Sequence, residues 1–213
     1  MTTCDEVFEN NRQWVEQKKK QQPEFFDRLA EGQHPDFLFI GCSDSRAPAA
    51  TIMGLEPGEV FVHRNVGNLM VNTDVNAHSV LEYAVEHLEV DHIVVCGHYG
   101  CGAVQAATEP KDLGLLNGWL REIRDVYRLH REELDAIDDP EQRRRRLVEL
   151  NIREQCTQLV KTAVVQRHYL NRGGPHVHGW VFCLSDGRLR DLEFPFEQKL
   201  DEIRETYDLA AGD

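Results

Sequence analysis

DFLFIGCSDSR (residues 36–46) and HIVVCGHYGCG (residues 92–102) each consist of a short apolar run followed by glycine and polar residues. Between them, HSVLEYAVEHL (residues 78–88) places apolar residues at intervals of three and four, the spacing of an amphipathic helix. Alternating strands and helices are typical of a parallel sheet with right-handed crossover connections. The two stretches therefore predict buried parallel strands in an α/β protein, with their polar residues at the carboxyl edge of the sheet.

The rest of the chain extends this pattern on both sides. EVFVHRNVGN (residues 59–68) predicts another strand, and residues 178–194 alternate around a Ser-Asp-Gly turn, which predicts a hairpin. Residues 5–31 read as a charged helical segment with a break at its proline. One long helix is expected over about residues 140–170, because an Asp-Pro-Glu sequence introduces it.

These elements predict one α/β domain over residues 1–213, with a central, mostly parallel β-sheet flanked by helices. Within it, residues 1–34 form an N-terminal helical arm, and residues 35–213 form the α/β core with C-terminal helices. The first part of the arm is highly charged and has little apolar surface of its own. We therefore expect the arm to pack on something outside its own domain.

Composition narrows the classes of partner. Lys and Arg total 24 against 37 Asp and Glu, so the formal net charge of −13 argues against nucleic acid and anionic membranes as partners. The longest apolar runs fall far short of the roughly 20 residues needed to span a bilayer. The N-terminal residues lack the apolar core of a signal peptide. We therefore expect a cytoplasmic protein whose six cysteines are thiols or metal ligands rather than disulfides.

Three residues with metal-binding side chains follow the two predicted strands. Cys42 follows the first, and His98 and Cys101 follow the second. Two thiolates and one imidazole are a common Zn²⁺ ligand set, and three protein ligands leave a fourth position for water or substrate. The alternative for any one of these residues is a buried thiol or a core histidine, but their placement on two matching strand ends favours a catalytic zinc site.

A charged pair lies beside the predicted metal ligands. Asp44 and Arg46 follow Cys42 by two and four residues. Asp44 can ligate the zinc itself, or it can stay paired with Arg46 and accept a hydrogen bond from a zinc-bound hydroxide. A purely structural Asp–Arg pair is the third interpretation.

CSDSR, HRNVGN and GHYGCG, taken together, closely resemble the motifs of the β-class carbonic anhydrases over residues 33–102. The downstream segments LGLLNGWL (residues 113–120) and HGWV (residues 178–181) also resemble the family, so the resemblance covers most of the chain. The resemblance implies zinc-dependent, reversible hydration of CO₂ to bicarbonate and a proton through zinc-bound hydroxide. It implies one Zn²⁺ per chain on Cys42, His98 and Cys101. Asp44 and Arg46 would form the family's catalytic dyad, in which Asp44 can also move onto the metal and close the site.

The same resemblance implies an assembly and a substrate pocket. The arm would embrace a partner subunit in a homodimer, which can pair further into a tetramer. Gln33 would reach into the pocket from the partner subunit. The apolar and aromatic walls would be Phe61, Val66 and Tyr83, and the backbone N–H of Gly102 would act as a donor.

Regulation by bicarbonate is expected to be weak or absent. In the bacterial members that bicarbonate inhibits, the noncatalytic site resembles a Trp, Arg and Tyr set, and this chain has Phe39, Arg64 and Phe182 at the matching positions. Two donors to an anion are therefore missing.

Two other functions use the same residues. The zinc site can instead hydrolyse a related small molecule such as COS or CS₂. Alternatively, the chain is a zinc-containing binding or redox-sensing protein in which Asp44 permanently closes the site. Activity that rises on the alkaline side of neutral is expected for the first hypothesis, because two thiolates offset the charge of zinc and weaken the acidity of its water.

Overall fold

The computed structural model describes residues 2–209, and the chain divides after His34 into two units. The first unit contains α1 (Cys4–Gln21) and α2 (Phe25–Glu31), with the predicted break between them. The Thr3 side chain accepts a hydrogen bond from the Glu6 N–H, while Glu6 accepts from the Thr3 N–H, so both N–H groups are satisfied at the start of α1. The helix α1 has no buried residue, although it carries apolar side chains.

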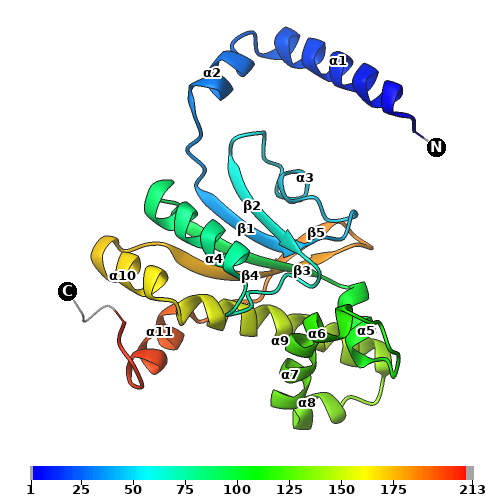
Figure 1. Ribbon diagram of the computed structural model, residues 1–213, viewed down its shortest axis with the longest axis vertical. Helices are drawn as coiled ribbons and strands as arrows, with labels where there is room; N and C mark the ends of the chain where they lie inside the picture. The colour runs from blue at the N-terminus through cyan, green and yellow to red at the C-terminus, as the bar shows by residue number, and fades with distance from the viewer. Residues whose placement is uncertain (1, 210–213) are drawn as a thin grey trace. The chain divides into compact units, whose positions relative to one another are not determined.

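The second unit is built on one five-stranded sheet in the order β2-β1-β3-β4-β5 (Figure 1). The pairs β2–β1, β1–β3 and β3–β4 are parallel, and β4–β5 is the predicted antiparallel hairpin. The mostly parallel sheet is therefore confirmed. The strands are β1 (Phe37–Cys42), β2 (Val60–Asn65), β3 (His92–His98), β4 (His176–Cys183) and β5 (Arg188–Asp191).

The larger apolar core lies on one face of the sheet, where α9 (Pro140–Val160) packs against β3 and β4 (Figure 1). Gly97 allows this close approach, because a Cβ atom there would lie 2.8 Å from Cδ1 of Ile152. A smaller apolar cluster that includes Phe39 and Phe182 covers the other face, beside α3 (Ala49–Met53). Both faces of the central strands are therefore buried, as their continuous apolar runs require.

The remaining helices follow the strands or flank α9. They are α4 (Val75–Glu82), a single π-helical turn η1 (Tyr83–His87), α5 (Gly102–Thr108), α6 (Leu116–Trp119), α7 (Arg121–Leu129), α8 (Arg131–Asp135), α10 (Ala163–Arg172) and α11 (Phe196–Arg204). Among residues 2–209, the helices include none that is long and apolar enough to cross a membrane.

The prediction of one long helix over residues 140–170 is wrong. The helix α9 ends at Val160, and Thr162 is extended (φ −80°, ψ 142°) before α10 begins. The buried Gln166 stabilises the break, because its Nε2 donates to the Val160 carbonyl, one of the groups left unpaired at a helix end. This local contact across six residues supports a break that the sequence pattern did not indicate.

Candidate metal centre

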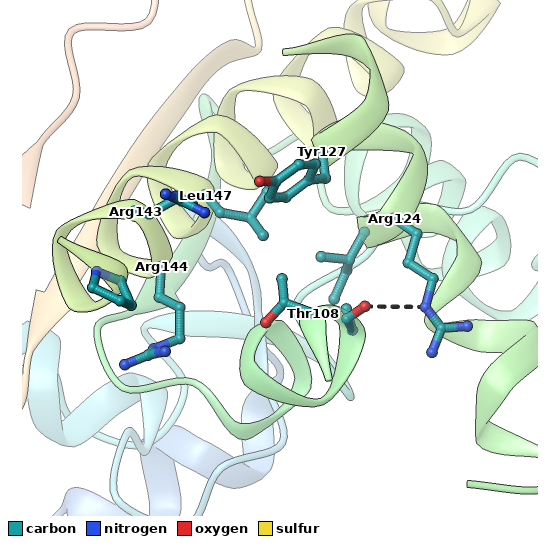
Figure 2. A pocket seen from close by; sticks show the side chains of 9 residues that line it. Thr108, Arg124, Tyr127, Arg143, Arg144 and Leu147 are labelled. Carbon is teal, nitrogen blue, oxygen red and sulfur yellow. Dashed lines mark hydrogen bonds between the residues drawn. The ribbon is translucent and has the colours of Figure 1, made fainter. Parts of the chain in front are cut away.

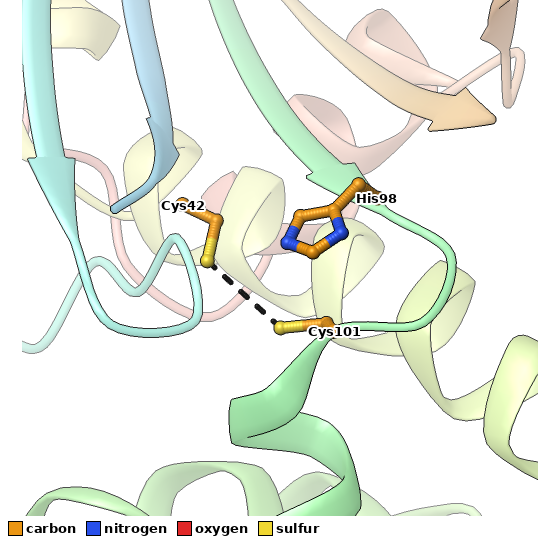
Figure 3. Close-up of side chains that lie close together, drawn as sticks. All are labelled: Cys42, His98 and Cys101. Carbon is orange, nitrogen blue, oxygen red and sulfur yellow. Dashed lines mark hydrogen bonds between the residues drawn. The ribbon is translucent and has the colours of Figure 1, made fainter. Parts of the chain in front are cut away.

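The carboxyl ends of β1 and β3 bring three metal-binding side chains together. Cys42 is the last residue of β1, His98 is the last residue of β3, and Cys101 precedes the first turn of α5. The strands are parallel neighbours, so both ends lie at the same edge of the sheet. The potential ligand atoms all lie within 4.8 Å of one another, and Figure 3 shows the three side chains pointing toward a common centre.

The hydrogen bonds of His98 prepare it to bind a metal. Its Nδ1 lies 3.1 Å from the Tyr99 carbonyl, so Nδ1–H donates there and Nε2 is left with a lone pair. Nε2 is buried and has no hydrogen-bond partner among residues 2–209. A buried, unsatisfied nitrogen is costly unless something binds it. The two sulfur atoms close by make zinc the fitting occupant.

The two thiols support the same conclusion electrostatically. The Sγ atoms of Cys42 and Cys101 are 3.9 Å apart. A hydrogen bond from Cys101 lowers the pKa of Cys42, and the resulting Cys42 thiolate raises the pKa of Cys101. The pair therefore loses its first proton more readily than its second, and positive charge between the sulfurs would favour loss of the second. A bound Zn²⁺ supplies that positive charge.

Asp44 and Arg46 form a bidentate pair next to these ligands. Arg46 Nε donates to Oδ1 of Asp44 over 2.9 Å, and Nη2 donates to Oδ2 over 2.7 Å. These bonds hold the pKa of Asp44 well below its usual range, so the carboxylate is ionised at neutral pH. Oδ2 also lies 3.5 Å from Nε2 of His98. The structure thus places the carboxylate on Arg46 and directly beside the metal ligands.

Arg64 supports the loop that carries this pair. Its Nε donates to the Cys42 carbonyl over 2.9 Å, and its Nη2 donates to the Asp44 carbonyl over 2.6 Å and to that of Ala47 over 3.3 Å. The resemblance in sequence implied for Arg64 only a place in a bicarbonate-binding site. The structure instead shows a guanidinium occupied by three backbone carbonyls, while Phe39 and Phe182 are buried in the smaller apolar cluster.

Replacing Arg64 with alanine is expected to lower the free energy of unfolding by about 3 kcal/mol, because three carbonyls lose a charged donor. Urea denaturation of the zinc-loaded protein measures this change. Arg190→Ala is the control, since Arg190 forms an exposed pair with Asp186 and should change the free energy by less than about 1 kcal/mol. Equal effects of the two substitutions would refute the supporting role of Arg64.

The predicted substrate wall lies on β2 and the segments around it. The rings of Phe61 and Tyr83 are 5.7 Å apart between centroids. Tyr83 begins the π-helical turn η1, a geometry that often occurs at functional sites and that no sequence signal indicated. Val66 and Tyr83 remain 40% and 46% exposed, so this wall has an open side. Gly102 is exposed at the start of α5, and Gln33 belongs to the first unit.

Two polar side chains that sequence analysis missed orient the loop after β2. Trp119 Nε1 donates to the Val66 carbonyl over 2.6 Å, and the buried Asn151 donates from Nδ2 to the Gly67 carbonyl over 3.1 Å. Asn151 and Gln155 lie one turn apart on the buried face of α9, and Gln155 accepts from the Met70 N–H. The sequence did carry a signal for Asn151 and Gln155, because they are polar residues at helical spacing on an otherwise apolar helix face.

Comparison with known proteins identifies close relatives. The family model described as carbonic anhydrase matches residues 37–189. A carbonic anhydrase of Emericella nidulans is 59% identical over 210 residues, which cover 99% of this chain and 92% of that protein. A carbonic anhydrase of Candida albicans is 33% identical over 92% of this chain and 70% of that protein.

Solved structures agree with the sequence relatives. The crystal structure of a β-carbonic anhydrase from Aspergillus fumigatus superimposes with a TM-score of 0.89 and 39% identity, covering 95% of this chain and 97% of that one. A tetrameric β-carbonic anhydrase from Sordaria macrospora gives a TM-score of 0.84 with 42% identity over 88% and 95% of the two chains.

Proposed function

Since the chain belongs to the β class of the carbonic anhydrase family, and therefore hydrates CO₂ reversibly at a zinc ion, we propose specific roles for the residues around its metal centre. The observation that carries this assignment is the convergence of the Cys42, His98 and Cys101 ligand atoms within 4.8 Å. These three residues would hold the zinc. When bound, zinc supplies the Lewis acidity that lowers the pKa of a water molecule.

Asp44 would act on the attacking water, and Arg46 would position Asp44. Once the water has lost its proton to solvent, the ionised carboxylate would accept a hydrogen bond from the remaining hydroxide and so orient an oxygen lone pair toward CO₂. The two bonds from Arg46 support this role because they fix the carboxylate plane. With Asp44 held in this way, a site that Asp44 permanently closes is the less favoured hypothesis, and the relatives do not favour a COS or CS₂ hydrolase.

The proposed pocket combines a dry wall with a backbone donor. Phe61, Val66 and Tyr83 would exclude water beside CO₂, which is small and apolar. The Gly102 N–H would donate to the bicarbonate oxygen that acquires charge, because the first N–H groups of a helix lack partners within it. Gln33 of a partner subunit would complete the open side.

Activity is expected to rise with pH through the alkaline side of neutral. The two thiolates of Cys42 and Cys101 offset the charge of the metal, so the water loses its proton at a higher pH than it would beside three neutral imidazoles. Stopped-flow measurement of CO₂ hydration from pH 6 to pH 9 checks this expectation. A rate that stays flat over the whole range would contradict it.

We also propose that α1 and α2 form the arm of a homodimer, which can pair further into a tetramer, and that 1–213 is one domain completed by its partner. The supporting observation is apolar surface on α1, where Val7 and Phe8 are 55% and 65% exposed. Phe8→Glu is expected to shift sedimentation from dimer or tetramer toward monomer, whereas Gln13→Glu, on the side of the same helix away from Val7 and Phe8, should not. Unchanged assembly in Phe8→Glu would refute the arm contact.

The proposed location is the cytoplasm, and the state of the cysteines supports it. None of the six forms a disulfide, and five of them are buried. Free thiols are typical of reducing compartments.

A further inference from the structure

A cavity of about 400 Å³ lies outside the metal centre, between α5, α7 and α9 (Figure 2). This volume is within the range of sites for small organic molecules. Its floor is apolar and buried, and consists of Ala107, Ile123 and Leu147. None of these residues has a part in the proposed hydration of CO₂, so that reaction does not explain the cavity.

The polar residues around the cavity are cationic or carry hydroxyl groups. Arg124, Arg143 and Arg144 line it together with the hydroxyl-bearing Thr108 and Tyr127. None of the nine lining residues in the described part of the chain carries a carboxylate, although the protein has a formal charge of −13. Two carboxylates contact the lining from outside it, Asp135 on the Tyr127 hydroxyl and Glu141 on Arg144. The three arginines outnumber them, which favours an anionic ligand.

Backbone carbonyls orient two of the guanidinium groups without neutralising them. Arg124 Nε donates to the Ala107 carbonyl over 3.1 Å, and Arg143 donates from Nε and Nη2 to the Ile137 carbonyl over 3.0 and 2.7 Å. In Figure 2, Arg143 and Arg144 lie on one side of the cavity and Arg124 lies on the other. The charges are therefore partly preorganised around an apolar centre.

Arg144 pairs with Glu141, which does not line the cavity. Their side chains are 2.9 Å apart at the closest approach and are 41% and 59% exposed. Such an exposed pair contributes little to stability, so Arg144 can turn to a ligand at small cost.

We propose that this cavity binds a small organic phosphate monoester, with its phosphate on the arginines and its apolar body on the apolar lining formed by Pro140 and the ring of Tyr127. The three guanidinium groups alone offer more donors than the two oxygens of a carboxylate can accept, whereas a phosphate presents three terminal oxygens. The Thr108 and Tyr127 hydroxyls already donate to the Gln105 carbonyl and to Asp135. An apolar body is expected as well as the anionic head, because Pro140 is exposed and the Tyr127 ring is half-buried, and inorganic phosphate alone would leave this apolar lining in contact with water.

Isothermal titration of the full-length, zinc-loaded protein with phenyl phosphate at low ionic strength tests the proposal. Phenyl phosphate is expected to bind more tightly than inorganic phosphate and benzoate, which lack the apolar body and the third oxygen, respectively. Arg124→Gln and Arg144→Gln are each expected to weaken binding about tenfold, because each removes one charge-assisted hydrogen bond.

Arg128→Gln is the matched control. Arg128 lies one turn after Arg124 on α7, is 73% exposed, pairs with Asp125, and does not line the cavity. It should leave the affinity for phenyl phosphate unchanged, and all three variants should retain CO₂ hydration, which shows that they fold. Binding of phenyl phosphate is measured without CO₂. A failure to bind it would therefore contradict this proposal without contradicting the proposed hydration of CO₂.

Three outcomes would overturn the proposal. The first is no detectable binding of phenyl phosphate at about 10 mM. The second is equal affinity in Arg124→Gln, Arg144→Gln and the unsubstituted protein, which would place the ligand elsewhere, such as at the metal centre. The third is inorganic phosphate that binds as tightly as phenyl phosphate, which would show that the apolar lining contributes nothing to binding.

Discussion

Replacing Cys42 with alanine is expected to remove zinc from the protein and to lower kcat/KM for CO₂ hydration by about a thousandfold or more. The substitution leaves His98 and Cys101 as a two-residue site, and it removes the thiolate whose charge the metal requires. Metal analysis of the purified variant and stopped-flow kinetics measure both effects. Full zinc content with unchanged activity would contradict the ligand assignment.

Cys96→Ala is the matched control for this substitution. Cys96 is a buried thiol on β3, two residues before His98, but it lies outside the ligand group. Burial raises the pKa of Cys96 to about 12, so its thiol stays protonated and serves packing. Removing its sulfur should leave zinc content and kcat/KM within about twofold of the unsubstituted protein, with at most a modest loss of stability. If Cys96→Ala also lost its zinc, the loss in Cys42→Ala could come from removing any buried thiol and would not identify Cys42 as a ligand.

Asp44→Asn is expected to retain zinc and to lower kcat by roughly a hundredfold to a thousandfold. Asparagine preserves the shape of the side chain but removes the charge that accepts two hydrogen bonds from Arg46. One end of the amide also becomes a donor, so it can no longer orient the attacking water as a carboxylate does. Kinetics on protein of measured zinc content separate this effect from loss of metal.

Asp186→Asn serves as the control for the loss of a carboxylate paired with arginine. Asp186 accepts a hydrogen bond from Arg190 in the turn between β4 and β5, outside the ligand group. It should leave kcat unchanged. Normal turnover in Asp44→Asn would show that the Asp44–Arg46 pair is structural.

The ligand group could be predicted because it follows from local patterns. Apolar runs ending in glycine mark β1 and β3, and parallel pairing places Cys42 and His98 at one edge of the sheet. Apart from the rule that parallel strands end at the same edge of the sheet, no knowledge of the tertiary structure was needed. The zinc site and the mostly parallel sheet were therefore accessible from sequence.

The supporting contacts could not be predicted, because they depend on the path of loops and on tertiary packing. The three carbonyl partners of Arg64 come together only when residues 42–47 fold back beside β2. The break after α9 depends on Gln166 reaching a helix end that precedes it in the chain. The π-helical turn at Tyr83 shares its apolar spacing with an ordinary helix, so periodicity does not distinguish the two.

Stopped-flow CO₂ hydration at pH 8.5, measured while zinc is removed by a chelator and then restored, tests the metal centre most directly. We expect the rate to fall in proportion to the zinc lost and to recover as the content returns to about one zinc per chain. Undiminished turnover in zinc-free protein, or no turnover at about one zinc per chain, would contradict hydration of CO₂ at Cys42, His98 and Cys101.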